Sequence, residues 1–324
     1  MSTRTDLLKL LSDNIGTYVS GQKIGDELKV SRNAIWKAMN QLRSEGYEIE
    51  SKPSVGYMLK SKENLLTYDS IAGDLRYPCQ LEVFDVIDST NNLAKEMEVG
   101  LKPLMIVADR QTAGRGRLGR SFASPASTGL YMTLALRPTF DLDKALYVTM
   151  AAAVAVCRAM EKVASVRGRI KWVNDIFYQK KKVCGILTEA QSNFETGKID
   201  KLIIGIGVNC FPGSFPEELA NIAGPIADSP AAFSRGKLVA EIFNETMAVL
   251  EDLESMRFLR EYRSKCFILG KNILVHPNLD QRSIKARAID IDENGGLVVE
   301  YMEGRKIRQM ETLTTGEVSI RLDE

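Results

Sequence analysis

The sequence predicts a multidomain α/β protein: a winged helix-turn-helix over residues 1–62, a central mixed-sheet domain over 65–268 and a small C-terminal β-barrel over 270–324. Three observations carry this prediction. The first 60 residues follow the order helix, turn, helix, hairpin, the middle mixes strand and helix patterns, and the hydrophobic period changes to two from Lys271 onward. A length of 324 residues allows roughly two or three domains, and a composition of 44% apolar and 26% charged residues is typical of a soluble globular protein.

The N-terminal region begins with an amphipathic helix that contains Leu7, Leu8, Leu10 and Leu11. A second helix is expected over Lys23–Leu28. Ser31 is a suitable N-cap for a third helix over Arg32–Glu45. The following segment alternates like two strands around a Pro-Ser-Val-Gly turn. Together these elements predict a winged helix-turn-helix.

The third helix of this region presents polar and basic side chains, which suit phosphates and base edges of DNA. The candidate DNA contacts are Arg32, Asn33, Lys37, Asn40, Gln41 and Arg43 on the helix and Lys52 at the wing tip. The net charge is only +1, so DNA binding would depend on this local surface rather than on a global field. The alternative is a winged helix that contacts only other proteins.

The middle of the chain alternates between strand and helix patterns. Strands are expected at Leu104–Asp109, Leu130–Leu136, Ile170–Val173, Val183–Thr188 and Leu202–Val208. Helices are expected over Lys144–Val163 and Lys237–Cys266. The C-terminal region predicts the short strands of a barrel, at Ile273–Val275, Ile284–Ile291, Leu297–Tyr301 and Val318–Leu322, with glycine-containing turns between them.

Several classes of protein are disfavoured by composition. The five cysteines are scattered and form no C-x-x-C pair, which argues against a disulfide framework or a zinc site and favours a reducing cytoplasm. The longest uncharged apolar run, Ala145–Cys157, is too short for a membrane-spanning helix. The N-terminus has no apolar signal core. We therefore expect a cytoplasmic protein without a membrane partner.

The stretch A-G-R-G-R-L-G-R, Ala113–Arg120, contains the spacing G-x-G-x-x-G. A dinucleotide-binding turn requires a helix that begins at the last glycine, whereas a proline and then a strand follow here. No Gly-Lys pair is followed by Ser or Thr, so a nucleotide P-loop is also absent. Glycines allow the backbone to close on a ligand, and arginine side chains suit carboxylates and phosphates. The stretch therefore predicts an anion-binding loop, and the alternative is a solvated basic loop.

The loop resembles the ligand loop of the biotin–protein ligases, and four further motifs follow that family in order. The five motifs are D-S-T-N-N (Asp88–Asn92), the extended loop (Asp109–Arg120), K-W-V-N-D-I (Lys171–Ile176), K-K-V-C-G-I-L-T-E (Lys181–Glu189) and G-I-G-V-N-C (Gly205–Cys210). With the winged helix in front, the chain is similar to the bifunctional bacterial type, which also represses the biotin operon. The resemblance covers essentially the whole chain and implies an SH3-like form for the C-terminal barrel.

The resemblance implies a reaction in which the biotin carboxylate attacks the α-phosphate of ATP, with Mg²⁺, to give biotinyl-5′-AMP and pyrophosphate. A lysine of a biotin carboxyl carrier domain, as in acetyl-CoA carboxylase, then takes the biotin as an amide. It also implies operator DNA of biotin genes and a homodimer promoted by biotinyl-AMP. A covalent enzyme intermediate is not implied, and the only histidine, His276, has no evident nucleophile partner.

The resemblance also implies roles for particular residues, with Arg117 and Lys182 as the catalytic pair. The biotin-binding candidates are Ser89, Thr90, Asn91, Gln111, Arg115, Gly116, Arg117 and Lys182. The nucleotide-binding candidates are Arg117, Arg120, Trp172, Asn174, Asp175 and Asn209, and Asp175 is also the candidate ligand for Mg²⁺. Phe122 departs from the family pattern, since some relatives carry tryptophan there, and this puts adenine stacking at that position in doubt.

Simpler interpretations exist for some of these residues. Ser-Thr-Asn alone is typical of a helix N-cap. Lys182 alone resembles a solvated hairpin lysine, as expected for Lys180 and Lys181. Two other functions compete with the biotin ligase and repressor. One is a lipoate–protein ligase, against which the G-R-G-R loop and the winged helix argue. The other is a repressor that senses a ligand without catalysis.

Overall fold

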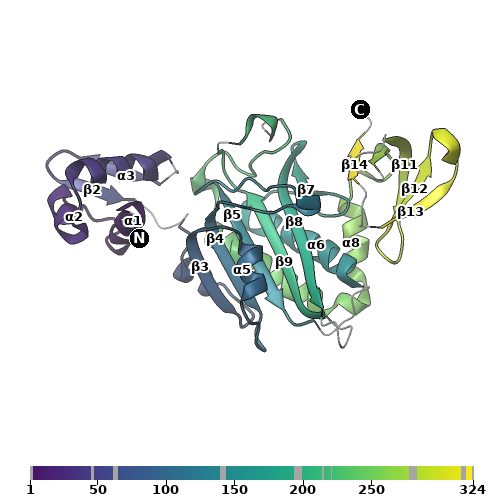
Figure 1. Ribbon diagram of the computed structural model, residues 1–324, viewed down its shortest axis with the longest axis horizontal. Coiled ribbons are helices and arrows are strands. Elements are labelled where there is room, and N and C mark those ends of the chain that lie inside the picture. Colours follow the sequence, from purple (N-terminus) through teal and green to yellow (C-terminus); the bar gives the residue numbers. More distant parts are fainter. Residues whose placement is uncertain are drawn as a thin grey trace.

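The protein has three parts arranged along its long axis, with the central sheet between a small N-terminal helical domain and a C-terminal sheet (Figure 1). The computed structural model describes residues 3–44, 47–60, 65–138, 144–192, 199–213, 215–219, 221–276, 283–314 and 319–322. None of the helices in these ranges is long and apolar enough to cross a membrane.

The N-terminal domain is the winged helix-turn-helix that the sequence predicts. Its elements are α1 (Thr3–Asp13), α2 (Gly21–Leu28), α3 (Arg32–Ser44) and the antiparallel wing β1 (Ile49–Lys52) and β2 (Gly56–Leu59). Ser20 caps α2 by accepting a hydrogen bond from Lys23 N. Leu7, Leu11 and Met39 lie in a core separate from that of the central domain. Glu45, the expected end of α3, lies outside the described residues.

The N-terminal domain contacts the central domain through polar groups, of which Arg4 and Asp109 are buried. Arg4 of α1 lies 3.7 Å from Asp85 and 4.0 Å from Asp109, and its guanidinium packs on the Tyr47 ring at 5.7 Å. Burial raises the pKa of Tyr47 to about 12. Asp109 also accepts a hydrogen bond from Arg235, so this contact reaches directly into the central domain.

The central domain is built on a seven-stranded mixed sheet in the order β3-β4-β5-β9-β8-β7-β6. Its strands are β3 (Gln80–Ile87), β4 (Leu104–Gln111), β5 (Gly129–Leu136), β6 (Arg169–Lys171), β7 (Asp175–Tyr178), β8 (Lys181–Ser192) and β9 (Ile199–Asn209). Only β3 and β4 are parallel. The sequence did not predict β3 or β7. The expected strand Ile170–Val173 was too long, because the chain turns after Lys171.

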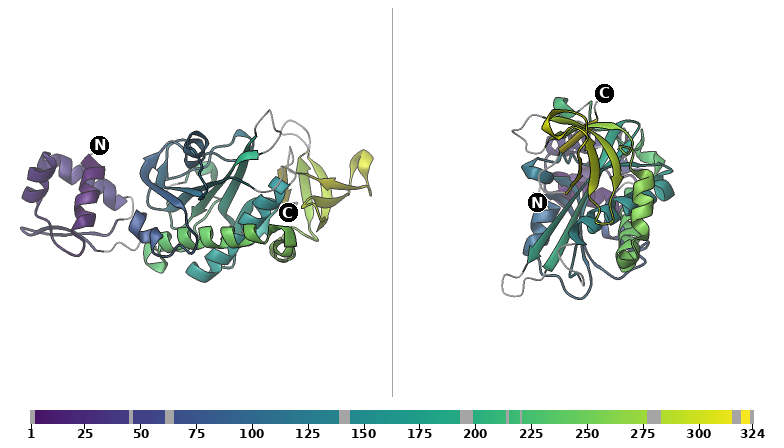
Figure 2. Two further views of the ribbon diagram at one scale, coloured as in Figure 1. Left: turned by 90° about the horizontal axis from the view of Figure 1, so that it is seen from below. Right: turned by 90° about the vertical axis from the view of Figure 1, so that its right-hand side faces the viewer.

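Both faces of the sheet are covered, and alternate residues of each strand therefore enter different cores. On β4, Leu104 and Ile106 pack beneath the short helix α5 (Thr90–Glu96), whereas Met105 and Val107 enter the larger core. The helices of that larger core are α4 (Tyr68–Ala72), α6 (Ala145–Ala164), α7 (Arg235–Glu251) and α8 (Arg257–Lys265). The left view of Figure 2 shows long helices along one side of the sheet.

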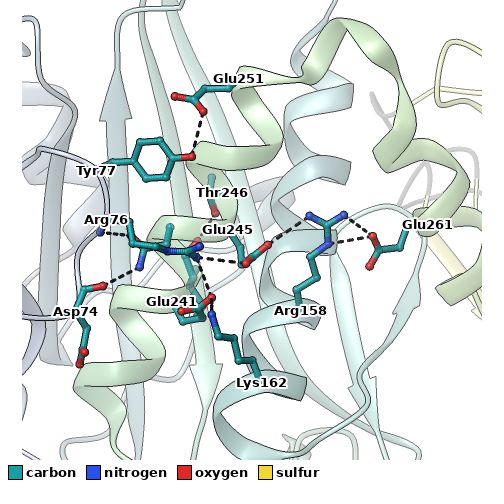
Figure 3. A network of polar contacts seen from close by, with 12 residues as sticks. Asp74, Arg76, Tyr77, Arg158, Lys162, Glu241, Glu245, Thr246, Glu251 and Glu261 are labelled. Carbon is teal, nitrogen blue, oxygen red and sulfur yellow. Dashed lines mark hydrogen bonds and ion pairs between the residues drawn. The ribbon is translucent and has the colours of Figure 1, made fainter.

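The expected helix Lys237–Cys266 is wrong as a single element. The structure has α7, a 3-10 turn at Leu253–Ser255 and then α8, because Met256 adopts the left-handed conformation with φ 58°. An ionic network ties these helices to α6 (Figure 3). Arg158 of α6 lies 3.3 Å from Glu245 of α7 and 2.6 Å from Glu261 of α8.

The C-terminal part is a five-stranded antiparallel sheet in the order β13-β12-β11-β10-β14. Its strands are β10 (Asn272–His276), β11 (Ile284–Ile291), β12 (Leu297–Tyr301), β13 (Met310–Leu313) and β14 (Ser319–Leu322). The described pairings leave β13 and β14 at the two ends, so closure into a barrel stays a prediction. Val318 lies outside the described residues, and β13 was not predicted. The buried residues of this sheet continue the larger core of the central domain.

Candidate active site

A cavity of about 1280 Å³ opens on the α5 side of the central sheet. Its floor is formed by glycines of neighbouring strands, Gly185 on β8 and Gly205 and Gly207 on β9. A Cβ atom at Gly205 would lie 2.1 Å from Asn91 Oδ1, and one at Gly207 would lie 2.5 Å from the Phe122 ring. The alternation of Gly205 and Gly207 with buried Ile204, Ile206 and Val208 thus clears one face of β9 while the other fills the core.

The N-terminus of α5 supplies a buried polar wall. Ser89 caps the helix by accepting a hydrogen bond from Asn92 N at 3.4 Å, as the N-cap interpretation predicts. The Thr90 backbone and hydroxyl both donate to Gln111 Oε1, at 2.9 and 3.0 Å. Thr133 Oγ lies 2.7 Å from Asn91 Oδ1. These side chains are uncharged and linked by hydrogen bonds, so they suit a neutral polar ligand group.

Glu189 on β8 joins this wall to the glycine loop. Its carboxylate accepts hydrogen bonds from Asn91 at 2.9 Å and from Lys95 of α5 at 2.8 Å, and it lies 3.3 Å from Arg115. Burial alone raises the pKa of Glu189, but these hydrogen bonds outweigh it and hold the pKa below its ordinary value. Arg115 is therefore paired with an internal carboxylate at the edge of the cavity.

The glycine loop does not have the geometry of a dinucleotide-binding turn. It leaves β4 at Gln111, forms a short 3-10 turn at Arg117–Gly119 and returns to β5 without starting an α-helix. Gly116 N donates to Arg120 O at 2.7 Å, which closes the turn, and Gly119 has φ 72°. The loop places Arg115, Arg117 and Arg120 on the cavity wall.

Arg117 and Lys182, the predicted catalytic pair, line the same cavity. Arg117 donates to Asn174 Oδ1 at 3.0 Å, and burial lowers the pKa of its guanidinium. Lys182 Nζ lies 2.7 Å from Asp175 Oδ1. Lys181, its neighbour in sequence, is not among the lining residues. The sequence pattern alone leaves Lys180, Lys181 and Lys182 equivalent. The structure sets Lys181 apart, whereas Lys180 lines the cavity as Lys182 does.

The remaining nucleotide candidates differ in position. Trp172 lines the cavity but is only 6% exposed, and its indole donates to Gly295 O of the C-terminal sheet at 3.0 Å. Asn209 does not line the cavity, and its amide lies 3.4 Å from Lys182 O. Phe122 packs on the glycine floor and against the Tyr131 ring at 6.3 Å.

The described residues provide neither a cluster of metal ligands nor a reactive thiol at the cavity. No cluster of three or more His, Cys, Asp or Glu side chains suited to a metal occurs in the described part of the chain. Asp175 is the only carboxylate among the lining residues that the structure describes. A single carboxylate fits a magnesium ion that takes its other ligands from phosphates and water. Burial raises the pKa of Cys184 and also that of Cys210, the latter to about 12, so neither is poised as a nucleophile.

The candidate DNA-binding residues lie mostly on the exposed side of α3. Arg32, Asn33, Lys37 and Gln41 are exposed there, and Asn40 is half-buried. Arg43 instead donates to Ile49 O at 3.1 Å and contacts Ser51, so it holds the wing against α3. Lys52 lies at the end of β1, 6.0 Å from the Tyr18 ring centre.

Comparison with known proteins supports each part of this architecture. Residues 83–209 match the biotin/lipoate A/B protein ligase family, residues 3–58 match an HTH domain and residues 268–321 match a biotin protein ligase C-terminal domain. The chain is 35% identical to the bifunctional ligase/repressor BirA of Bacillus subtilis over 316 residues, 94% of this chain and 95% of the relative. The chain belongs to the bifunctional ligase/repressor BirA family.

Further members and solved structures agree with this assignment to the BirA family. The Escherichia coli bifunctional ligase/repressor BirA is 30% identical over 298 residues, 91% of each chain. Among solved structures, the biotin protein ligase of Aquifex aeolicus in complex with biotin and ATP matches with a TM-score of 0.62 and 29% identity. That match covers 75% of this chain and 99% of the other. The family resemblance inferred from the five motifs is therefore confirmed.

Several residues of this BirA-family site were missed in the sequence. Glu189 ends a recognised motif, but its partner Asn91 is 98 positions away, and no local pattern links them. Thr133 lies in an ordinary strand and shows no signal. Lys95 could have been predicted from the sequence, because it stands one helical turn after Asn91 and shares its face of α5. Arg169 and Lys271 also line the cavity and were not singled out.

Proposed function

We propose that the cavity binds biotin beside ATP, joins them as biotinyl-5′-AMP and passes the biotin to a lysine of a biotin carboxyl carrier domain, as in acetyl-CoA carboxylase. The observation that carries this proposal is that the cavity has two chemically different walls. An uncharged polar wall around Thr90 meets a cationic wall that contains Arg117 and Lys182. The neutral ureido group of biotin suits the first wall, and its carboxylate and the ATP phosphates suit the second.

The chemistry requires positioning and charge stabilisation rather than a covalent intermediate. A biotin carboxylate oxygen attacks the α-phosphorus, and the bond from that phosphorus to the bridging oxygen breaks, with pyrophosphate taking the electron pair. Lys182 and Arg117 stabilise the negative charge near the reacting oxygens. Asp175 would hold a Mg²⁺ ion, which when bound neutralises charge on the phosphates. In the second step, the carrier lysine attacks the biotinyl carbonyl, AMP leaves and the amine loses a proton.

The test is biotin transfer to an apo-carrier domain in the presence of Mg-ATP, detected by a streptavidin blot. We expect labelling that requires ATP, biotin and the acceptor lysine. A lipoate ligase would instead label the carrier with lipoate, and a sensor without catalysis would label nothing. Either result would refute the proposed ligase activity. The free cysteines and the substrates fit a cytoplasmic location, which we include in the proposal.

We predict that Arg117→Ala weakens binding of biotin and biotinyl-AMP while leaving the fold intact. The residue lies in a surface loop, and its guanidinium contacts Asn174 on the cavity wall. The loss of a hydrogen bond from a charged group corresponds to about tenfold weaker binding or more. Release of biotinyl-AMP into solution, followed by chromatography, measures the effect. A variant that retains the adenylate as long as the wild type would show that Arg117 does not bind it.

We also propose that the winged helix binds operator DNA of biotin genes, and that residues 1–62 can be removed without loss of ligase activity. The fragment should fold because Leu7, Ile24, Met39 and their neighbours form a core of their own. It should lose operator binding. Ligand retention is expected to weaken, because Arg4 no longer contacts Asp109. A folded fragment without carrier biotinylation would show that the two functions are not separable.

The two functions are coupled, in our proposal, through a homodimer promoted by biotinyl-AMP. One winged helix with few basic residues has modest affinity, so tight operator binding requires two copies on two half-sites. If the ligand favours the dimer, dimerisation must favour the ligand to the same extent. Sedimentation and operator titration, each with and without biotin and ATP, measure this coupling. Equal operator affinity in both conditions would contradict it.

A further inference from the structure

Trp36 is an exposed tryptophan on α3, the helix that carries most of the candidate DNA contacts. The residue is 59% exposed, although tryptophan is usually largely buried in a folded protein. Within the described part of the chain, its indole has no hydrogen-bond or ring partner. It is not among the candidate DNA contacts predicted from the sequence, and it does not belong to the core of the winged helix.

The exposed apolar side chains of the winged helix lie on the two elements that this kind of domain presents to DNA. Among the described residues of the domain, Trp36 and Val55 are the only large hydrophobic side chains that are exposed. Trp36 is on α3, and Val55 is in the turn of the wing between β1 and β2. Single exposed hydrophobic residues are common on protein surfaces. The restriction of these two to α3 and the wing favours a role in DNA binding.

The neighbours of Trp36 on α3 are polar or basic. Residues three and four positions apart share one side of a helix, so Arg32 and Asn33 lie one turn before Trp36. Asn40 lies one turn after it, and Lys37 follows it on the exposed side. An aromatic ring within such a surface suits a partner that carries both negative charge and apolar groups, as DNA does.

Both ends of α3 are fixed within the domain. Ser31 caps the helix by accepting a hydrogen bond from Ala34 N at 3.3 Å. Near the other end, Arg43 donates to Ile49 O of the wing strand β1 at 3.1 Å. Trp36 is therefore presented on a helix that is held against the wing, and its ring can enter the major groove in a defined orientation.

The major groove offers one apolar group to such a ring, the C5 methyl of thymine. The other groups on the base edges there are hydrogen-bond donors and acceptors, which suit Arg32, Asn33 and Asn40. The indole of Trp36 has a flat apolar surface and a single N–H donor. Contact with a thymine methyl buries apolar surface that water covers in the free protein, and it distinguishes thymine from cytosine, which lacks this methyl group.

We propose that Trp36 packs against the C5 methyl of a thymine in each half-site of the operator and so helps to set the DNA sequence that the protein recognises. The inference rests on the proposed operator binding by the winged helix. Contacts of Arg32 and Lys37 with phosphates would place α3 on the duplex but carry no sequence information by themselves. Trp36 adds selectivity for one base, while the salt-dependent part of the affinity comes from the cations.

The test uses a duplex selected from a random-sequence library by the wild-type chain in the presence of biotin and Mg-ATP. Each thymine of this duplex is then replaced in turn by deoxyuridine, which removes only the C5 methyl group. For the wild type, one position in each half-site should weaken binding about fourfold when replaced, as expected for loss of one buried methyl group. Trp36→Ala should weaken binding to the unmodified duplex about tenfold or more, and the same replacement should then have no further effect.

Two variants serve as controls. Trp36→Phe should keep part of the dependence on the methyl group, because a phenyl ring can also pack against it. Tyr68→Ala should leave operator affinity unchanged, since Tyr68 is a 60% exposed aromatic residue on α4, outside the winged helix. Binding of Trp36→Ala to a nonspecific duplex should stay at the wild-type level at each salt concentration, because the cations are kept. This last measurement also shows that the winged helix of the variant is folded.

A wild-type affinity that no deoxyuridine replacement changes would overturn the inference. So would an equal effect of the replacement in the wild type and in Trp36→Ala, or an equal loss of specific and nonspecific binding. A weaker dimer in sedimentation, with unchanged DNA affinity of the dimer, would also contradict it, because Trp36 would then lie at a contact between two copies. If the wild-type chain selected no sequence from the library, operator binding itself would be refuted, which is a separate outcome.

Discussion

Lys182→Ala should slow formation of biotinyl-AMP by on the order of 100-fold, about 3 kcal/mol, as loss of one charge-stabilising donor does. Lys182 lies in the cavity with its ammonium 2.7 Å from Asp175, beside the wall that contains Arg117. Without the ammonium, the charge that develops at phosphorus loses a cation, and Asp175 loses its partner. Single-turnover adenylate formation, measured by rapid quench with labelled ATP, reports the effect without the transfer step.

Lys181→Ala is the matched control for this prediction. Lys181 is the adjacent lysine with the same charge, but it does not line the cavity, and its side chain packs near Gly224. We expect the rate of adenylate formation in this variant to stay within about twofold of the wild type, as is usual for substitutions away from a site. Equal losses in the two variants would mean that Lys182 has no special place in the reaction.

The second large effect is on stability, at the buried ion pair between Asp109 and Arg235. Arg235 is 1% exposed and donates to Asp109 at 2.7 Å and to Gly129 O at 2.6 Å. Asp109 also accepts hydrogen bonds from Ser127 N at 3.1 Å, across the base of the ligand loop. Arg235→Ala leaves a buried carboxylate without its main partner, so the free energy of unfolding should fall by about 3–5 kcal/mol.

Urea denaturation followed by tryptophan fluorescence measures this change. The chain has two tryptophans, so a Trp36→Phe background leaves Trp172 of the central domain as the only reporter. Arg257→Ala, which removes an exposed ion pair with Asp252, should change the free energy of unfolding by less than about 1 kcal/mol. If Arg235→Ala were as mild as this control, the Asp109–Arg235 pair would not stabilise the central domain.

The parts of the fold with regular local patterns could be predicted from the sequence. The winged helix was predictable because its apolar residues follow one helical face and turn residues separate its elements. β3 was missed because it lies at the edge of the sheet. Leu81 is the only buried residue of this strand, so its hydrophobic pattern is weak. The break at Met256 was missed because neither glycine nor proline marks it.

In the site, too, residues within a contiguous motif could be predicted from the sequence, whereas contacts between distant segments could not. The loop arginines and Lys182 could be singled out because they stand within contiguous motifs, and the structure places them on the wall of one cavity. Their roles in binding and catalysis stay predictions. The pairing of Arg115 with Glu189 was not visible, since it depends on how the loop after β4 lies against β8. Lys271 was hidden for a similar reason, because only the docking of the C-terminal sheet brings it to the cavity. Contacts between distant segments require the tertiary structure.

The most direct test of the central claim is the amount of biotinyl-AMP formed on the protein when no carrier is present. Wild-type chain is mixed with biotin, Mg-ATP and pyrophosphatase, and the bound nucleotide is identified by mass spectrometry. We predict about one biotinyl-AMP per chain, together with complete transfer of the biotin to lysine when apo-carrier is added. Folded protein that binds biotin and ATP but yields neither biotinyl-AMP nor biotinylated carrier would contradict the claim that this cavity activates biotin.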